Sequence, residues 1–210
     1  MTARLLAATG LLLVACGETD SARVSFDFGP LWQQLAQEAS QISVRVFDYD
    51  NNLLKTRLLQ DFESTLLMDV EAGPRRRFEV EATFLEAALR VPSYYGELYS
   101  DLFAGEVADL EVPIFPAGGF RGEVHLPTDS ITLPTGTLLI AEAHEPRPDA
   151  PASKSFAIEA GAFEGTLPDG EYTFSVELSL AGGISYSGQI DVTIERSAII
   201  DSVIIRLDDN

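Results

Sequence analysis

Apolar and polar residues alternate with period two along most of this chain. In the first half the alternation runs from Val24 to Phe28, from Ile42 to Val46 and from Phe78 to Ala82. Such alternation places one side of a strand in a core and the other in water. Turn-forming residues separate these runs at 48–52, 72–74 and 104–106. The pattern predicts half-buried antiparallel strands joined by short turns.

The second half continues in the same way. An exposed loop is expected at 146–151, because three prolines there do not suit a central strand. Strands are predicted at 120–126, 137–143, 155–158, 163–167, 171–180, 184–194 and 199–207.

One stretch departs from the alternation. Leu31, Trp32, Leu35 and Ala39 fall on one helical face, and Pro30 suits a first helical position. We therefore expect a short helix within 30–41.

The second half also repeats the first. Thr173–Ser179 matches Arg77–Thr83 at an offset of 96, and Tyr186–Ile190 matches Tyr94–Leu98 at an offset of 92. The four-residue difference falls in the connection 85–93, which is longer than its counterpart 181–183. For the closing strands, an offset of 92 matches Asp109 to Asp201. We prefer an offset of 93, which matches the apolar residues Leu110, Val112 and Ile114 to Val203, Ile205 and Leu207 and so keeps the same face of each strand in the core. We predict two units of one topology, with Gly96 and Gly188 in equivalent positions.

Each unit has about 95 residues and about seven short strands, which is typical of an immunoglobulin-like (Ig-like) sandwich. The segment 167–174, Leu-Pro-Asp-Gly-Glu-Tyr-Thr-Phe, resembles the Pro-x-Gly-x-Tyr-x-apolar turn of transthyretin-like and carboxypeptidase-regulatory-like modules. That resemblance implies a Greek-key sandwich and no particular chemistry. The expected fold is therefore all-β, with tandem Ig-like (Greek-key, transthyretin-like) β-sandwich domains at 24–115 and 120–210 and a linker at 116–119.

The first sixteen residues carry a separate signal. Arg4 precedes an apolar run that ends at Cys16, the only cysteine, and the run is too short to span a bilayer. Residues 13–16, Leu-Val-Ala-Cys, resemble the lipobox of bacterial lipoproteins. The resemblance implies a signal peptide at 1–15, lipidation of Cys16 and a lipidated tether at 16–23. The alternative is an ordinary secretory signal with an incidental cysteine. In Gram-negative lipoproteins the absence of aspartate at position 17 leans toward the outer membrane.

Charge limits the partners. The chain has 33 acidic and 14 basic residues and a net charge of −19, which disfavours nucleic acid and anionic lipid surfaces. With no cysteine beyond Cys16, an intrachain disulfide and a Cys-based metal site are excluded. We expect no cofactor.

One candidate metal site is an acidic turn. Asp48, Asp50 and Asn52 begin like a calcium loop, but an EF-hand needs glycine and glutamate where this chain has Leu53 and Leu59. A looser calcium loop stays open, and we favour a hairpin turn in which the asparagines adopt positive φ.

A zinc site would need both histidines. His125 and His144 have Glu123, Glu142 and Glu145 nearby in sequence. Nothing in the pattern places the two histidines together, so we expect them on the surface.

Three further features have a functional and a structural interpretation. Ser185 and Ser187 do not fit a nucleophile elbow, because a strand follows them and both histidines precede them. Arg75–Arg77 would suit an acidic partner, although we favour a solvated strand start balanced by carboxylates. The aromatic residues that would suit sugar stacking, if they are not packing residues, are Trp32, Tyr94, Tyr95 and Tyr99.

Together these features predict a non-catalytic envelope lipoprotein that acts as a binding or structural module on the periplasmic or surface side. Its expected partners are the membrane, through the lipid on Cys16, and an envelope protein or polysaccharide. The alternative is a carbohydrate- or calcium-binding surface protein, and the third choice is an accessory domain of a hydrolase.

Overall fold

The computed structural model describes residues 20–27, 35, 37, 39–59, 65–86, 89–128, 132–180 and 183–209. Most of these residues lie in β-strands, which confirms the predicted all-β class. Within these ranges no helix has the length and apolar character needed to cross a bilayer. The predicted signal peptide, Cys16 and Trp32 lie outside the described residues.

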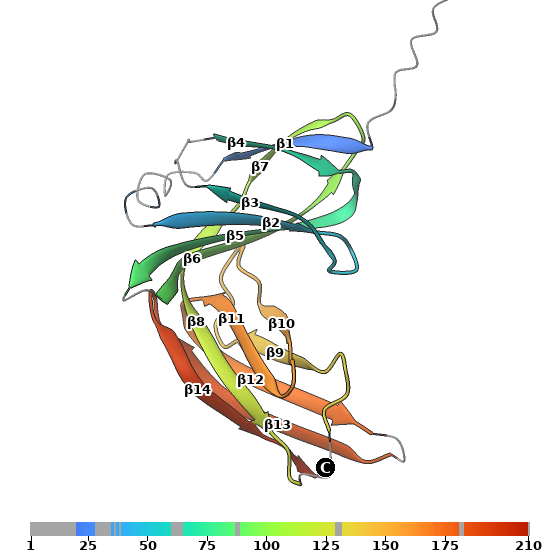
Figure 1. Cartoon of the computed structure of the whole chain (residues 1–210), viewed down its shortest axis with the longest axis vertical. Helices are drawn as coiled ribbons and strands as arrows, with labels where there is room; N and C mark the ends of the chain where they lie inside the picture. Colours follow the sequence, from blue (N-terminus) through green and yellow to red (C-terminus); the bar gives the residue numbers. More distant parts are fainter. Residues whose placement is uncertain are drawn as a thin grey trace, which may run out of the picture.

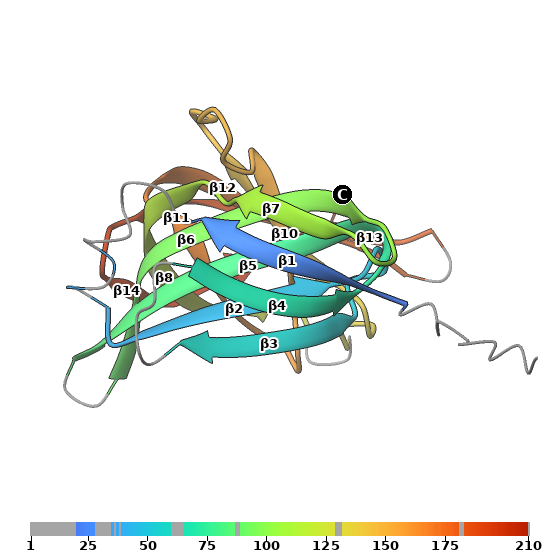
Figure 2. The same ribbon diagram turned by 90° about the horizontal axis from the view of Figure 1, so that it is seen from above.

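Strands β1 to β7 form the first sandwich, called unit 1 here. One sheet has the order β4-β1-β7. The other has the order β3-β2-β5-β6, and it continues from β6 to β8 as part of a seven-stranded sheet that reaches into unit 2. Seen from above, β1, β4 and β7 form a layer over the other four strands (Figure 2). The bounds are β1 (Ser21–Asp27), β2 (Gln41–Phe47), β3 (Leu53–Leu59), β4 (Thr65–Glu71), β5 (Gly73–Glu86), β6 (Leu89–Leu102) and β7 (Val107–Glu111).

Strands β8 to β15 form the second sandwich, called unit 2. Its sheets are β11-β8-β14 and β10-β9-β12-β13-β15. The two units follow one another along the long axis of the molecule (Figure 1). The bounds are β8 (Ile114–His125), β9 (Leu138–Ala143), β10 (Ser153–Ala157), β11 (Ala162–Pro168), β12 (Gly170–Ser179), β13 (Ser185–Ile194), β14 (Ile199–Arg206) and β15 (Asp208–Asp209).

The two units share one topology, as the sequence repeat predicts. β1 pairs antiparallel with β4 and parallel with β7, and β8 pairs in the same way with β11 and β14. The other sheets, β3-β2-β5-β6 and β10-β9-β12-β13, also correspond strand for strand. In an Ig constant-type domain the first strand pairs with the second. Here it pairs with the fourth and the seventh, so the Greek-key sandwiches are of the transthyretin-like kind.

Each unit has its own apolar core. The buried side chains form one cluster that runs from Ala22 to Ile114 and a second that runs from Phe120 to Leu207. Phe26 and Phe78 meet edge-to-face across the sheets of unit 1, and Phe120 and Phe174 do so in unit 2. The apolar positions of the alternating strands thus supply both cores.

Gly96 and Gly188 occupy equivalent positions, as predicted. Gly96 pairs with Val80, and Gly188 pairs with Val176. A Cβ atom on Gly96 would lie 2.5 Å from the Pro113 carbonyl oxygen, and one on Gly188 would lie 2.2 Å from that of Arg206. Gly96 therefore allows the chain just after β7 to pass close to the sheet, and Gly188 does the same for the last residue of β14.

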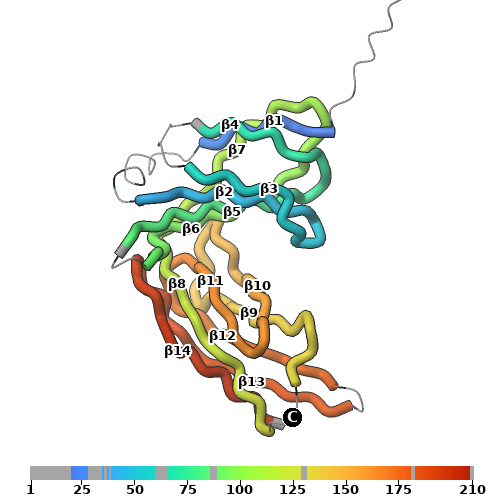
Figure 3. The backbone as a smooth tube through the Cα atoms, viewed as in Figure 1, coloured from blue at the N-terminus to red at the C-terminus, as the bar shows by residue number. Residues whose placement is uncertain are grey.

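The segment 116–119, predicted as a linker, is part of β8. This strand begins beside β6 in unit 1, where Ile114 pairs with Gly96, and continues as the first strand of unit 2 (Figures 1 and 3). Gly118 is explained by packing, because a Cβ there would lie 2.1 Å from the Glu195 carbonyl oxygen. The glycines and the proline interrupt the alternation without interrupting the strand.

Three smaller expectations also change. β1 already begins at Ser21, within the predicted tether. The expected connection 85–93 is mostly strand, because β5 and β6 extend to Glu86 and from Leu89. Leu35 and Gln37 are helical, but most of the predicted helix lies outside the described residues, and β2 begins at Gln41.

Candidate functional site

The outer face of sheet β3-β2-β5-β6 carries charged residues where unit 1 meets unit 2. Arg45 comes from β2, Arg77 and Glu79 from β5, and Tyr95 and Glu97 from β6. Register explains why they lie together, because Arg45 pairs with Glu79, and Glu79 with Glu97. Their neighbours along each strand face the core of unit 1, so the alternation places all five side chains on the opposite face.

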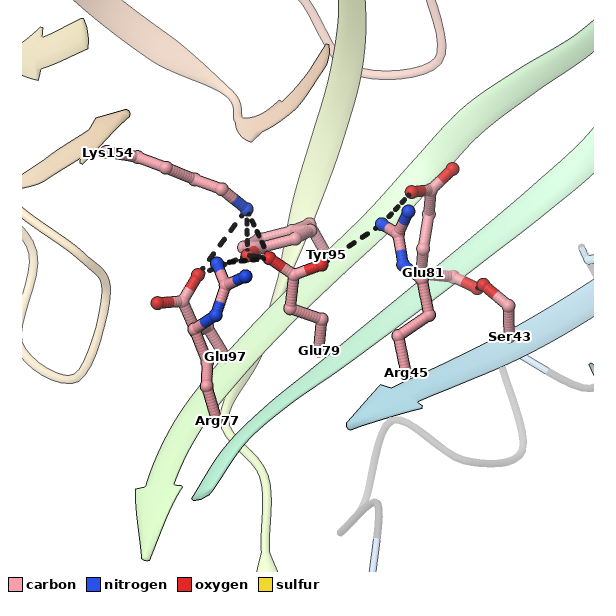
Figure 4. A network of polar contacts seen from close by, with 8 residues as sticks. All are labelled: Ser43, Arg45, Arg77, Glu79, Glu81, Tyr95, Glu97 and Lys154. Carbon is pink, nitrogen blue, oxygen red and sulfur yellow. Dashed lines mark hydrogen bonds and ion pairs between the residues drawn. The ribbon is translucent and has the colours of Figure 1, made fainter. Parts of the chain in front are cut away.

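Lys154, on β10 of unit 2, reaches into this group. Its Nζ lies 2.9 Å from Glu79 Oε1 and 3.4 Å from Glu97 Oε2 (Figure 4). The same ammonium donates to the Tyr95 hydroxyl, which in turn donates to Glu97. Arg77 Nη1 lies 2.8 Å from Glu79 Oε1. A lysine of one unit is thus held by two carboxylates and a phenol of the other. We call these residues, with Arg45 and Glu81, the junction network.

The junction network is largely withdrawn from water. The Lys154 side chain is 10% exposed, and those of Glu79 and Glu97 are each 5% exposed. Burial acts to raise the pKa of Glu79, but the charges of Lys154 and Arg77 outweigh it and hold that pKa below its usual value. Burial, with the charges of Glu79 and Glu97, raises the pKa of Tyr95 well above its usual value. Glu79 is therefore an anion and Tyr95 a neutral hydrogen-bond donor at neutral pH.

Glu81 responds differently from its neighbour. Burial raises the pKa of Glu81 above its usual value, against the attraction of Arg45, whose Nη2 lies 3.1 Å from Glu81 Oε2. Arg45 Nη2 also lies 3.2 Å from Glu79 Oε2. Arg45 therefore shares one nitrogen between two carboxylates.

The equivalent face of unit 2 lacks this chemistry. The shared register places Ser175 where unit 1 has Glu79, Ser187 where it has Tyr95, and Gln189 where it has Glu97. Gln189 is exposed. Since both units fold alike, the sandwich itself does not require the charged set. The charges of unit 1 belong to the contact with unit 2.

A second contact closes the other side of the junction. The Arg196 guanidinium lies over the Tyr94 ring, 4.9 Å from its centroid, and donates to the Tyr94 hydroxyl. Ser197 N donates to the Ala117 carbonyl oxygen at 2.9 Å. The β13–β14 turn is thereby fixed against both β6 and β8.

A groove of about 700 Å³ lies at the junction. Its walls come from β2, β5 and β6 of unit 1 and from β8, β10 and β11 of unit 2. Besides members of the junction network, it is lined by Phe47, Arg90, Arg121, Phe156 and Glu164. Clefts between sandwiches are favoured places for ligands. Its side chains offer charge, hydrogen bonds and aromatic faces, which suit binding.

The predicted acidic turn connects β2 and β3. Asn52 donates to both Asp48 carboxylate oxygens, from its backbone N–H and from its side chain, each at 2.8 Å. Asn51 has a φ of 63°, as a tight turn requires. Hydrogen bonds from Asn52 lower the pKa of Asp48. Both carboxylate oxygens of Asp48 are thus engaged within the turn. Asp50 lies in the same turn.

The structure does not bring the two histidines together. His125 lies near Glu123, at the end of β8, while His144 lies near Glu171 and Asp191 at the start of the β9–β10 loop. Within the described ranges, no group of three or more His, Cys, Asp or Glu residues is placed to hold a metal.

Ser185 and Ser187 lie on strand β13. There they pair with Ser179 and Glu177 of β12.

The arginine run is less solvated than expected. Arg76 is buried and donates to the carbonyl oxygens of Glu71 and Ala72, and Arg77 packs on the Phe47 ring. Arg75 lies over the exposed rings of Tyr49 and Tyr99.

Of the aromatic candidates for sugar stacking, Tyr94 and Tyr95 are buried, and Tyr99 is half exposed.

Sequence reasoning missed the junction network. Arg45, Arg77, Glu79 and Glu97 all stand at polar positions of alternating strands, which the pattern assigns to water. Lys154 gave no signal of its own. The sequence held one indication of it: the aligned repeats have Ser175 in unit 2 at the position of Glu79 in unit 1.

The comparisons with known proteins concern the fold alone. No family model and no curated protein matches the sequence. A leucine-rich repeat protein from Bacteroides thetaiotaomicron matches with a TM-score of 0.49 and 12% identity over 90% of this chain and 26% of its own. The minor pilin of Streptococcus agalactiae matches with a TM-score of 0.32 and 11% identity over 90% of this chain and 97% of its own. A candidate adhesin from Bacteroides ovatus matches with a TM-score of 0.34 and 10% identity over 99% of both chains.

Proposed function

We propose that this chain is a non-catalytic envelope lipoprotein that presents a two-sandwich binding module from a membrane. The observation that carries the proposal is the junction network, which joins two sandwiches through buried ion pairs and leaves a groove between them. Such a module holds a binding surface in a fixed shape, which lowers the entropy lost when a ligand binds.

Lipid on Cys16 supplies the attachment in this proposal. β1 begins only five residues after Cys16, so unit 1 would lie next to the bilayer and unit 2 farther from it. The net charge of −19 disfavours direct adsorption to anionic lipid. Several acyl chains, as the lipobox resemblance implies, hold a protein firmly. We assign the protein to the outer membrane, with a polysaccharide or an envelope protein as its partner.

Labelling with a clickable palmitate analogue in the producing bacterium tests the attachment. The wild-type protein should incorporate the label, and Cys16→Ala should lose it and keep residues 1–15. The variant Ser21→Ala, close to the same site, should be labelled like the wild type. Equal labelling of wild type and Cys16→Ala would overturn the proposal.

The module is also proposed to need no metal. Asp48 is engaged by Asn52, so stability should not depend on calcium. We expect the melting temperature to stay within about 1 °C in EDTA, since removing a ligand that binds only the folded state would lower it. A large fall that calcium reverses would show that the turn at 48–52 binds the ion.

A further inference from the structure

The junction groove concentrates positive charge in an acidic protein. Of the 14 lysine and arginine residues in the chain, five line this one groove: Arg45, Arg77, Arg90, Arg121 and Lys154. Four glutamates also line it, and Glu97, which pairs with Lys154, brings the carboxylates to five, so the positive and negative charges balance there. The molecule as a whole carries −19. An anion is therefore repelled less at this groove than the strongly acidic charge of the whole molecule would suggest.

Two of these arginines, Arg90 and Arg121, do not belong to the junction network. The Arg90 side chain is exposed and forms no ion pair or hydrogen bond with any residue in the described ranges. Arg121 is half exposed, and its Nε lies 3.5 Å from Glu164, which is itself 78% exposed. Both guanidinium groups can turn toward a ligand without breaking a buried contact.

Within the junction network, hydrogen-bond donors also lack acceptors. Arg45 Nε and Arg77 Nε are buried and have no hydrogen-bond partner among the described residues. A buried donor of this kind destabilises the fold while it stays unpaired. An oxygen-rich ligand would favour this part of the groove if Arg45 adjusts its side chain.

One wall of the groove comes from a hairpin extension that unit 1 has and unit 2 lacks. The extra four residues of the β5–β6 hairpin, absent from the β12–β13 hairpin, place Arg90 and Pro92 beside unit 2. A Cβ on Gly119 of β8 would lie 3.4 Å from the Pro92 ring. The shorter hairpin of unit 2 shows that the sandwich folds without this extension.

We infer that the junction groove binds a short saccharide that bears carboxylates, such as an oligomer of uronic acids. This inference rests on the proposed binding function and names the ligand class of its groove. Arg90 and Arg121 would bind carboxylates, because the guanidinium fork matches their geometry. Phe47 and Phe156 also line the groove, but Arg77 lies over the Phe47 ring and Phe156 packs on Phe120, so each ring adds apolar contact for a sugar without being a free stacking face. The mostly polar lining suits hydroxyl groups better than apolar peptide side chains.

Isothermal titration calorimetry of the full-length protein in detergent tests this inference. The probe is trigalacturonic acid, with maltotriose as the neutral control and tetra-aspartate as the acidic peptide control. We expect binding of trigalacturonic acid that weakens with salt, and no detectable heat with either control. Arg90→Ala combined with Arg121→Ala should weaken binding at least tenfold.

The matched control is Arg206→Ala, which removes the same charge from an exposed position on β14 outside the groove. It should bind like the wild type. Circular dichroism of each variant checks that it folds. No binding by the wild type, equal binding of maltotriose or tetra-aspartate, or an unaffected double variant would each overturn the inference. If the protein still incorporates palmitate, only the ligand class fails, and the proposed membrane module stands.

Discussion

At the scale of single residues, Gly96 and Gly188 test the packing of the two sandwiches. Alanine at either position would place a Cβ within 2.5 Å of a backbone carbonyl oxygen, which cannot move without displacing its strand. We expect each substitution to lower the free energy of unfolding by about 1 to 3 kcal/mol. Denaturant unfolding followed by circular dichroism measures it.

The control is Gly119→Ala, also in a strand, where the nearest heavy atoms would be 3.4 Å away. This change should alter stability by less than about 1 kcal/mol. Equal effects at Gly96 and Gly119 would contradict the close approach as the reason why glycine occupies this position in both units.

Glu79 predicts a pH dependence of stability. Its pKa in the folded protein lies below the ordinary value of 4.5, so its contribution is complete above pH 4.5 and is lost as the pH falls through the folded-state pKa. Glu81, with a raised pKa, opposes this trend. Glu79→Gln should destabilise the protein by about 2 to 4 kcal/mol at pH 7, because three cations lose their shared carboxylate.

The difference between wild type and Glu79→Gln should shrink as the pH falls from 5 to 3. Urea unfolding at each pH measures it. Glu145→Gln, at an exposed loop position, provides the control and should match the wild type throughout. A pH-independent difference would mean that Glu79 acts through packing and not through its charge.

At the scale of elements, β8 differs from the linker that its composition suggests. Two residues inserted after Gly118 should disrupt its pairing with β11 and β14. We expect a loss of at least about 2 kcal/mol, or about 4 to 8 °C in melting temperature for a chain of this size. The same insertion after Asp149, in the exposed β9–β10 loop, should have little effect. Calorimetry that shows equal tolerance at both sites would restore the linker interpretation.

The sequence predicts most strands because alternation reports which side chains face a core. It predicts the strand at 171–180 and the matching positions of Gly96 and Gly188 for this reason. It fails at 116–119, since glycine serves close packing there as readily as flexibility. It also fails at Glu79, because a polar position looks the same whether water or another sandwich covers it. Contacts between units depend on tertiary placement, which the period-two pattern does not contain.

At the scale of the whole molecule, Lys154 decides whether the two units move as one body. Lys154→Met keeps the length and apolar stem of the side chain but leaves Glu79 and Glu97 without their cation from unit 2. β8 still joins the units, so each sandwich should stay folded while the angle between them varies. Spin labels on Lys55→Cys in β3 and Arg206→Cys in β14 report that angle as a distance distribution. We expect a narrow distribution for the parent protein and a clearly broader one with Lys154→Met.

The labelled positions Lys55 and Arg206 both lie outside the junction network. Arg147→Met, which removes an exposed ion pair with Asp169 inside unit 2, should leave the distribution narrow. An equally narrow distribution with Lys154→Met would show that β8 and the Arg196–Tyr94 contact fix the units without the junction network.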